Sequence, residues 1–371
     1  MAPHDETNNA DSVRQAAGAA AAQTPPTHRP DLGPETAQGS VPEDEVPGWH
    51  ADVLGAGYER LTLPLGTDDE GEVVATLVRA PKPSWWSTQR GVARNTDVVY
   101  IHGWSDYFFQ TNLAEFWRER GARFYAIDLR KYGRSLRPGQ TPGYVEDLTT
   151  YDADIEAALH EIGHGASQTS TRRLVLFGHS TGGLTLSLWA ARHPGRATAM
   201  VLNSPWLELQ TRELGRMAFA PMNSTLMKIG RKTPYPQIDR GFYTKSLLKQ
   251  LGGEWEYNTA WRPELTFAVY PGWLDAVIKG HQTVAHKLHL TIPVYVMLSA
   301  RSVIRTTWDE SMRKADTVLD VEGVAARCKD LGESTTLVRL DGALHDVVLS
   351  SRPVRERAFA GLHTWLRGYL N

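Results

Sequence analysis

The chain has 371 residues, of which 41% are apolar and 22% are charged, and its formal net charge at pH 7 is -2. This balance is normal for a globular protein with a large core. Acidic and basic side chains are interspersed, so the sequence offers no basic stripe for nucleic acid, no polybasic face for a membrane surface and no run of ~20 apolar residues for a spanning helix.

Cys328 is the only cysteine. This excludes an intramolecular disulfide and a cysteine metal cluster, and we expect a buried free thiol. Residues 1–9 contain Asp5 and Glu6 where a signal peptide carries basic residues, and residues 16–22 lack the leucines of a signal-peptide core. We therefore expect a cytoplasmic protein without stable membrane insertion.

Residues 1–45 are rich in Ala, Pro, Gln, Thr and Glu and contain almost no large apolar side chain. Such a segment cannot bury enough apolar surface to offset the entropy cost of ordering, so we predict a disordered tail. The fold is then expected in one domain, residues 46–371.

From residue 58 onward the pattern predicts strands that alternate with helices. Residues 58–65 and 72–78 alternate apolar and polar side chains around the turn-forming residues 66–71, which predicts an antiparallel edge hairpin. Buried-type strands follow at 97–101, 122–127, 174–177, 198–202, 293–298 and 335–340. Helical patterns lie at 113–120, 152–162, 184–193, 321–331 and 353–369. This order predicts an α/β fold with a mostly parallel sheet covered by helices on both faces.

The alternation is interrupted once, between Ser204 and about residue 290. No buried strand is evident there, and the segment is rich in Trp, Tyr, Phe and Met. An insertion of this size is the expected form of a cap over a site at the carboxyl edge of a parallel sheet. We predict a cap at residues 206–290 above the substrate pocket, with most of its aromatic side chains forming the cap's own core.

Residues 174–183, LVLFGHSTGG, combine an apolar strand-type run with the pattern Gly-x-Ser-x-Gly, and the apolar periodicity of a buried helix follows. This predicts a strand, a sharp turn and a helix. A serine at such a turn has a strained backbone and an exposed hydroxyl, and the flanking glycines are needed because side chains there would collide with the strand and helix. Ser180 is the candidate nucleophile; the alternative is an ordinary glycine-rich turn.

Three other motifs accompany this one: HGW at 102–104, DLRKYGRS at 128–135 and GALH at 342–345. Together they resemble the α/β-hydrolase superfamily, and specifically its branch of monoacylglycerol lipases, lysophospholipases and serine aminopeptidases S33. The resemblance covers roughly residues 58–370. It implies an eight-stranded, mostly parallel sheet, a helical cap between strands six and seven, and a catalytic triad in the chain order serine, acid, histidine.

The base that activates the serine is assigned to His345. Histidine suits this role because its ordinary pKa lies near neutrality. His345 follows the strand predicted at 335–340 and precedes the last helix, which is where the family's histidine lies. His102 and His179 belong to the same predicted edge, but they occupy motif positions that shape the oxyanion loop and the serine turn.

The acid is expected a few residues after the strand at 293–298, but residues 301–308 contain no carboxylate. The later sequence ADTVLD resembles the family's run of Ala-Asp, three residues and a second Asp before the next helix. The resemblance points to Asp316, with Asp320 and Asp309 as alternatives. Each of these carboxylates would also suit a helix N-cap.

The oxyanion hole is expected to use two backbone N–H groups, one from the residue after the nucleophile and one from the loop after strand 97–101. These groups belong to Thr181 and Trp104. Asp106 and Arg134 are expected to support these loops, unless they form a surface salt bridge or a turn cap instead.

Residues 160–164, HEIGH, give a competing interpretation. In a helix this spacing places His160 and His164 on one face, where they bind zinc while Glu161 activates a water molecule. Against a zinc peptidase, Gly163 predicts the end of the helix, the extended zinc motif is absent and no third ligand is indicated nearby.

We therefore predict a serine hydrolase that cleaves carboxylic esters of small, lipid-like molecules through an acyl-enzyme, without a metal or organic cofactor. The alternatives are the zinc metallopeptidase and a hydrolase fold that binds a ligand without turnover, because a fold does not determine a function. The sequence leaves the acyl and alcohol groups of the substrate and the oligomeric state open.

Overall fold

In the computed structural model, the protein is described over residues 47–370, except residues 56, 210–222, 224, 225, 229 and 238. The tail predicted for residues 1–45 lies outside the described residues, as does part of the predicted cap. Within the described chain, no helix combines the length and apolar character needed to cross a membrane.

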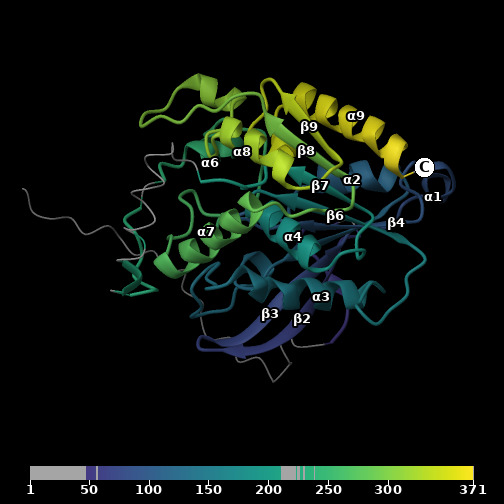
Figure 1. The fold of residues 1–371 in the computed structure, drawn as a ribbon, viewed down its shortest axis with the longest axis horizontal. Helices are drawn as coiled ribbons and strands as arrows, with labels where there is room; N and C mark the ends of the chain where they lie inside the picture. Colours follow the sequence, from purple (N-terminus) through teal and green to yellow (C-terminus); the bar gives the residue numbers. More distant parts are fainter. Residues whose placement is uncertain are drawn as a thin grey trace, which may run out of the picture. The chain divides into compact units, whose positions relative to one another are not determined.

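The described residues form a sheet of nine strands in the order β1-β2-β3-β5-β4-β6-β7-β8-β9 (Figure 1). The pairs from β5 through β4 to β9 are parallel, whereas β1, β2 and β3 pair in antiparallel fashion. The strands are β1 His50–Ala51, β2 Glu59–Asp68, β3 Gly71–Arg79, β4 Thr96–Ile101, β5 Arg123–Asp128, β6 Arg173–His179, β7 Ala199–Asn203, β8 Val294–Ser299 and β9 Thr335–Leu340. The predicted mostly parallel sheet is confirmed.

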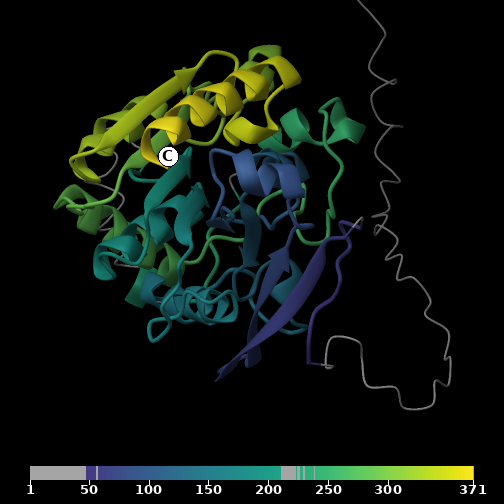
Figure 2. The ribbon, with the colours of Figure 1, turned by 90° about the vertical axis from the view of Figure 1, so that its right-hand side faces the viewer.

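The sheet has one strand more than the eight that were predicted. The additional strand is β1, whose two residues pair with Arg60 and Glu59 of β2. Two residues are too few to show a period of two, so the sequence pattern does not reveal this strand. The β2–β3 hairpin is also longer than predicted, because Asp68 pairs with Gly71 across a shorter turn. Figure 2 shows the hairpin in purple and β9 with α9 in yellow at opposite ends of the sheet.

Helices cover both faces of the sheet, as predicted. Alternate residues of β4 illustrate the reason, because Val98 and Tyr100 join one buried apolar cluster while Val99 and Ile101 join the other. The first cluster is covered by α2 Thr111–Glu119 and α9 Arg352–Tyr369. The second is covered by α3 Tyr151–Glu161, α4 Thr181–Arg192, α7 Pro271–Ala285 and α8 Val321–Arg327.

The segment between β7 and β8, where the cap was predicted, contains α6 Phe242–Leu247, the 3-10 helix η4 Lys249–Leu251 and α7. Helix α7 begins with Pro271 in its first turn, a position where the missing proline N–H costs no helical hydrogen bond. Its buried side chains, including Trp273 and Val277, pack in the same apolar cluster as α4. The short helix α1 Trp85–Arg90 was not predicted, because it buries no side chain and shows no apolar face.

The parallel strands end at one edge of the sheet, and the loops that leave this edge carry the predicted site residues. Ser180 follows β6, Trp104 lies beyond the end of β4, and His345 lies in the loop between β9 and α9. Parallel strands that are connected through helices bring such loops together although they are far apart in sequence.

Candidate active site

Ser180 lies at a sharp turn between β6 and α4, as its motif predicts. Its backbone has φ 52° and ψ -118°, a conformation that residues with side chains rarely adopt. A Cβ atom on Gly182 would lie 2.3 Å from the carbonyl oxygen of His102, and one on Gly178 would lie 2.6 Å from Cα of Gly183. Only glycine fits at these two positions, so the sequence motif and the strained turn explain each other.

His345 lies within hydrogen-bond distance of Ser180. Its Nε2 atom lies 3.1 Å from Oγ of Ser180, and its Nδ1 atom lies 2.8 Å from Oδ2 of Asp316. All three side chains are buried. The arrangement joins an acid, an imidazole and a hydroxyl in one hydrogen-bonded chain, which allows the imidazole to accept the serine proton while the carboxylate balances the resulting charge.

The position of Asp316 depends on how the loop after β8 folds back. Asp316 donates its N–H to the carbonyl of Arg301 at 3.0 Å, and its own carbonyl accepts the N–H of Val303 at 2.8 Å. The intervening residues therefore leave the strand end and return to it, so that Asp316 lies next to the end of β8. Its Oδ1 accepts the N–H groups of Val318 and Leu319 at 2.7 and 2.8 Å, which fixes the orientation of the carboxylate.

The two alternative acids occupy other positions. Asp320 accepts the N–H of Glu322 and caps α8, whereas Asp309 accepts the N–H of Ser311 and caps the 3-10 helix η5 Glu310–Lys314. Each carboxylate thus satisfies a helix end that would otherwise lack a partner. Neither hydrogen bonds to His345 in the described structure.

The two residues predicted to supply the oxyanion donors lie beside Ser180. Thr181 is the first residue of α4, so its N–H has no intrahelical acceptor. The loop that carries Trp104 passes close to Ser180, because a Cβ atom on Gly103 would lie 3.0 Å from Cβ of Ser180. The indole of Trp104 packs against Trp273 of α7 with ring centroids 3.7 Å apart.

A small pocket adjoins Thr181 on the side of α7. Its walls are mainly apolar and come from the loops after β4 and β5, from the start of α3, from α4 and from α7: His102, Gly103, Leu129, Tyr132, Leu148, Tyr151, Thr181, Leu184, Thr185, Trp273 and Val277. Such a surface suits an apolar part of a ligand more than a charged one.

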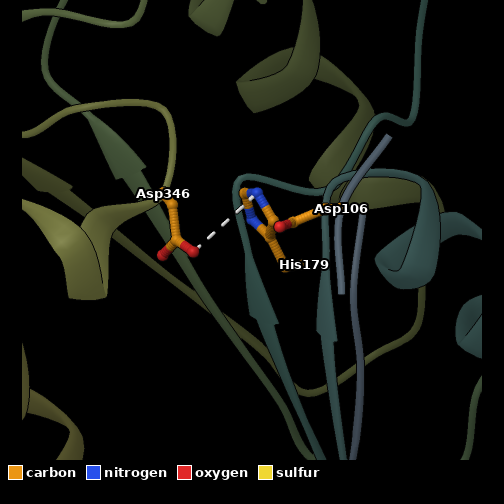
Figure 3. Close-up of side chains that lie close together, drawn as sticks. All are labelled: Asp106, His179 and Asp346. Carbon is orange, nitrogen blue, oxygen red and sulfur yellow. Dashed lines mark ion pairs between the residues drawn. The ribbon is translucent and has the colours of Figure 1, made fainter. Parts of the chain in front are cut away.

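Three buried side chains that were not predicted to interact lie close to His345. Figure 3 shows the imidazole of His179 between the carboxylates of Asp106 and Asp346. Burial lowers the pKa of His179 and raises that of Asp106, although Arg262 acts to lower the latter. The His179 ring lies 4.9 Å from the ring of His345, centroid to centroid.

This cluster is the one group in the described chain whose His, Cys, Asp or Glu atoms lie close enough to hold a metal, within 4.8 Å of one another. Both carboxylates already accept hydrogen bonds from protein donors. Asp106 accepts from Arg262 at 3.1 Å, and Asp346 accepts from Asn203 at 2.6 Å and from Gln110 at 3.2 Å. These donors supply the stabilisation that a cation would otherwise provide.

The competing HEIGH motif, residues 160–164, does not lie at the edge of the sheet that carries Ser180. Helix α3 ends at Glu161, and both His160 and Glu161 are exposed. His164 is buried after the helix, where its Nε2 atom lies 2.9 Å from Oδ2 of Asp97 near the start of β4. The two histidines therefore do not share a helical face, and the motif lies near the amino end of β4, whereas Ser180 follows the carboxyl end of β6.

Sequence comparisons agree with the motifs. Residues 93–303 match the family model described as serine aminopeptidase, S33. A monoacylglycerol lipase from Mycolicibacterium smegmatis is 31% identical over 109 residues, which are 29% of this chain and 37% of that protein. The chain thus spans about a third of the length of the curated relatives that it matches.

Structural comparisons extend the likeness to most of the chain. The crystal structure of a monoacylglycerol lipase from Paleococcus ferrophilus has a TM-score of 0.55 at 19% identity, covering 75% of this chain and 96% of that one. A soluble variant of monoglyceride lipase from Saccharomyces cerevisiae, in complex with a substrate analogue, has a TM-score of 0.57 at 15% identity, with coverages of 83% and 96%. The predicted α/β-hydrolase fold is confirmed.

Proposed function

This chain belongs to the serine aminopeptidase S33 family of α/β-hydrolases, and from that membership we propose that it is a serine hydrolase that cleaves carboxylic esters. The observation that carries the proposal is the hydrogen-bonded chain from Asp316 through His345 to Ser180. An inert serine needs neither a buried imidazole at its hydroxyl nor a carboxylate behind that imidazole. The same observation disfavours a fold that binds a ligand without turnover.

In the proposed mechanism, Nε2 of His345 accepts the proton of Ser180 as Oγ bonds to the ester carbonyl carbon. The electron pair of the carbonyl moves to its oxygen, where the N–H groups of Trp104 and Thr181 stabilise the negative charge. The carboxylate of Asp316 holds the imidazole in place and balances its positive charge.

The tetrahedral intermediate then collapses. The bond to the alcohol oxygen breaks, this oxygen takes the proton from His345, and the acyl group remains on Ser180. A water molecule attacks the acyl carbon in the same way, with His345 as the base. Cleavage of the bond to Oγ releases the carboxylic acid and returns the proton to Ser180.

We propose that residues 206–290 act as the cap and that the substrate is a small, lipid-like ester. The small pocket beside Thr181 supports this proposal through the mainly apolar character of its walls, which suits an apolar group next to the serine. The names of the relatives, monoacylglycerol and monoglyceride lipase, agree with such a substrate. Glycerol monoesters and simple alkyl esters are therefore the first compounds to test.

The test combines a fluorophosphonate probe with a panel of p-nitrophenyl and monoacylglycerol esters. The wild-type protein should be labelled once per chain and should hydrolyse at least one ester, while the Ser180→Ala variant should do neither. Normal turnover by Ser180→Ala would disprove the proposed nucleophile. Loss of activity when bound zinc is removed would favour the metallopeptidase instead.

A further inference from the structure

Tyr243, in helix α6 of the segment between β7 and β8, contacts the loop that carries His345. Its Oη atom accepts the backbone N–H of Asp346 at 3.0 Å. Its ring packs edge-on against the imidazole of His345, with centroids 5.4 Å apart and planes at 79°. The hydrogen bond fixes the backbone directly after His345, and the ring limits the rotation of the imidazole.

Arg262, from the same segment, contacts the loop that carries Trp104. Its Nε atom donates to Oδ1 of Asp106 at 3.1 Å, and both side chains are nearly inaccessible to solvent. Its guanidinium lies 5.1 Å from the centre of the Tyr243 ring, within the range of a cation–π contact. The two residues therefore contact each other as well as the two loops.

A buried polar cluster also connects the two loops that Tyr243 and Arg262 contact. Asp106 and Asp346 are the two carboxylates that flank His179 in Figure 3, and Asp346 lies 4.0 Å from Nε2 of that ring. The Nδ1 atom of His179 donates to the carbonyl of Asn203 at 3.0 Å. Tyr243 and Arg262 thus close over a buried polar cluster that joins the His345 loop to the Trp104 loop.

We propose that Tyr243 and Arg262 are positioning residues for ester hydrolysis, which hold the catalytic imidazole and an oxyanion donor in a fixed relation. The proposal rests on the function proposed above. Displacement of one reacting group by 1 Å costs up to about 10²-fold in rate, so contacts that fix both loops affect the transition state more than substrate binding. The part of the cap that carries Tyr243 and Arg262 accordingly stays in place and supports the two catalytic loops.

The first test replaces one oxygen atom. Tyr243→Phe keeps the ring against His345 but leaves the N–H of Asp346 without its acceptor. We expect kcat on the best ester to fall about fivefold to tenfold with KM changed less than about twofold, because a hydrogen bond of this kind is worth about that factor. The control is Tyr369→Phe at the end of α9, whose hydroxyl lies beside Ser334, before the start of β9 and thus at the sheet edge opposite the site.

The second test separates positioning from general cap stability. Lys232 also holds this segment, by donating to the carboxylates of Asp69 and Glu70 at the β2–β3 turn, and these partners lie outside the loops that carry Trp104, Asp316 and His345. Arg262→Gln should lower kcat at least about tenfold, and Arg262→Lys should recover part of the loss because it keeps the charge opposite Asp106. Lys232→Gln should lower the melting temperature and leave kcat within about twofold.

A readout without substrate distinguishes failure of this proposal from failure of the proposed function. Amide hydrogen exchange at Asp346 should be at least about tenfold faster in Tyr243→Phe than in wild type, and unchanged in Tyr369→Phe. If the wild-type protein neither reacts with the fluorophosphonate probe nor hydrolyses any ester, the proposed function is wrong. Unchanged kcat and unchanged exchange in Tyr243→Phe would overturn the positioning role, and equal kcat losses in Arg262→Gln and Lys232→Gln would show that the effect is one of cap stability.

Discussion

Oδ2 of Asp316 lies 2.8 Å from Nδ1 of His345. A carboxylate accepts but does not donate hydrogen bonds, so it favours the tautomer of the imidazole that carries its proton on Nδ1. In that tautomer the lone pair of Nε2 faces Oγ of Ser180 at 3.1 Å. One contact between two side chains therefore determines which lone pair of the imidazole faces the serine hydroxyl.

Ser180→Ala should lower esterase activity by about 10⁶-fold, to near background, because the hydroxyl that forms the acyl-enzyme is gone. His345→Ala should have a similar effect. The double variant should be no worse than either single variant, because the two residues act as one unit. Steady-state kinetics on one ester measures these effects, and unchanged melting temperatures would show that the fold is intact. Additive losses would contradict a common mechanism.

The positions of Ser180 and His345 were predictable because their signals are local or depend only on chain order. The glycines around Ser180 indicate a sharp backbone turn. A histidine in the loop after the last parallel strand lies at the same sheet edge as that turn. Asp316 was harder, because the sequence after β8 departs from the family pattern. The contacts of Asp316 with Arg301 and Val303 return the loop to the strand end, and no periodicity in the sequence records them.

The support around the triad was not predictable from the sequence. Arg262 and Asp106 are separated by 156 positions, so their pairing depends on how the segment after β7 folds over the sheet. Helix α7 was not assigned from the sequence, although Asp275, Lys279, Gln282 and Thr283 recur at helical spacing on its less buried side, because the aromatic-rich segment was interpreted only as a cap as a whole.

His160→Ala and His164→Ala should both retain esterase activity in the presence of a chelator. His160 is exposed and should tolerate the change without loss of stability, whereas removal of His164 deprives the buried Asp97 of a hydrogen bond and should lower the melting temperature. Activity assays with EDTA and a metal analysis test this prediction. Stoichiometric zinc that is lost together with activity in either variant would contradict it.

Gly182→Ala should destabilise the protein by about 1–3 kcal/mol or prevent correct folding of the serine turn, because the new methyl group would collide with backbone oxygens that cannot easily move. The matched control is Gly368→Ala in helix α9, which has no atom within 4 Å of the new Cβ and should stabilise the helix by up to about 1 kcal/mol. Urea unfolding measures both changes. Equal stability of the two variants would show that the turn can relax.

Asp97→Asn should lower stability most at neutral pH. Burial alone would raise the pKa of Asp97, but hydrogen bonds from Arg123 and His164 lower it to about 2. A carboxylate with a lowered pKa in the folded state stabilises the fold above its unfolded pKa and loses this effect as the pH falls through the folded value. The stabilisation of about 2 kcal/mol at neutral pH should therefore disappear between about pH 4 and pH 2.

The measurement is the difference in unfolding free energy between wild type and Asp97→Asn at several pH values. This difference in unfolding free energy should become smaller as the pH falls below 4. The control Asp341→Asn, at an exposed position, should have nearly the same unfolding free energy as wild type at every pH. A difference that stays constant down to pH 2 would mean that the charge of Asp97 does not stabilise the fold.

The choice between the three candidate acids leads to the sharpest prediction. Oδ1 of Asp316 accepts two backbone N–H groups, from Val318 and Leu319, so an asparagine at this position must keep its carbonyl oxygen there. Its NH₂ group then faces Nδ1 of His345 and donates to it. The imidazole is driven to carry its proton on Nε2, where it points at Ser180 and cannot act as a base.

Asp316→Asn should therefore lower kcat by about 10⁴-fold with little change in KM, because the lost interaction grows in the transition state. Asp320→Asn and Asp309→Asn should cost at most a few-fold, since asparagine caps a helix about as well as aspartate. Comparison of kcat for the three variants on one ester decides the assignment. If Asp316→Asn remained within about tenfold of wild type, another carboxylate would have to orient His345.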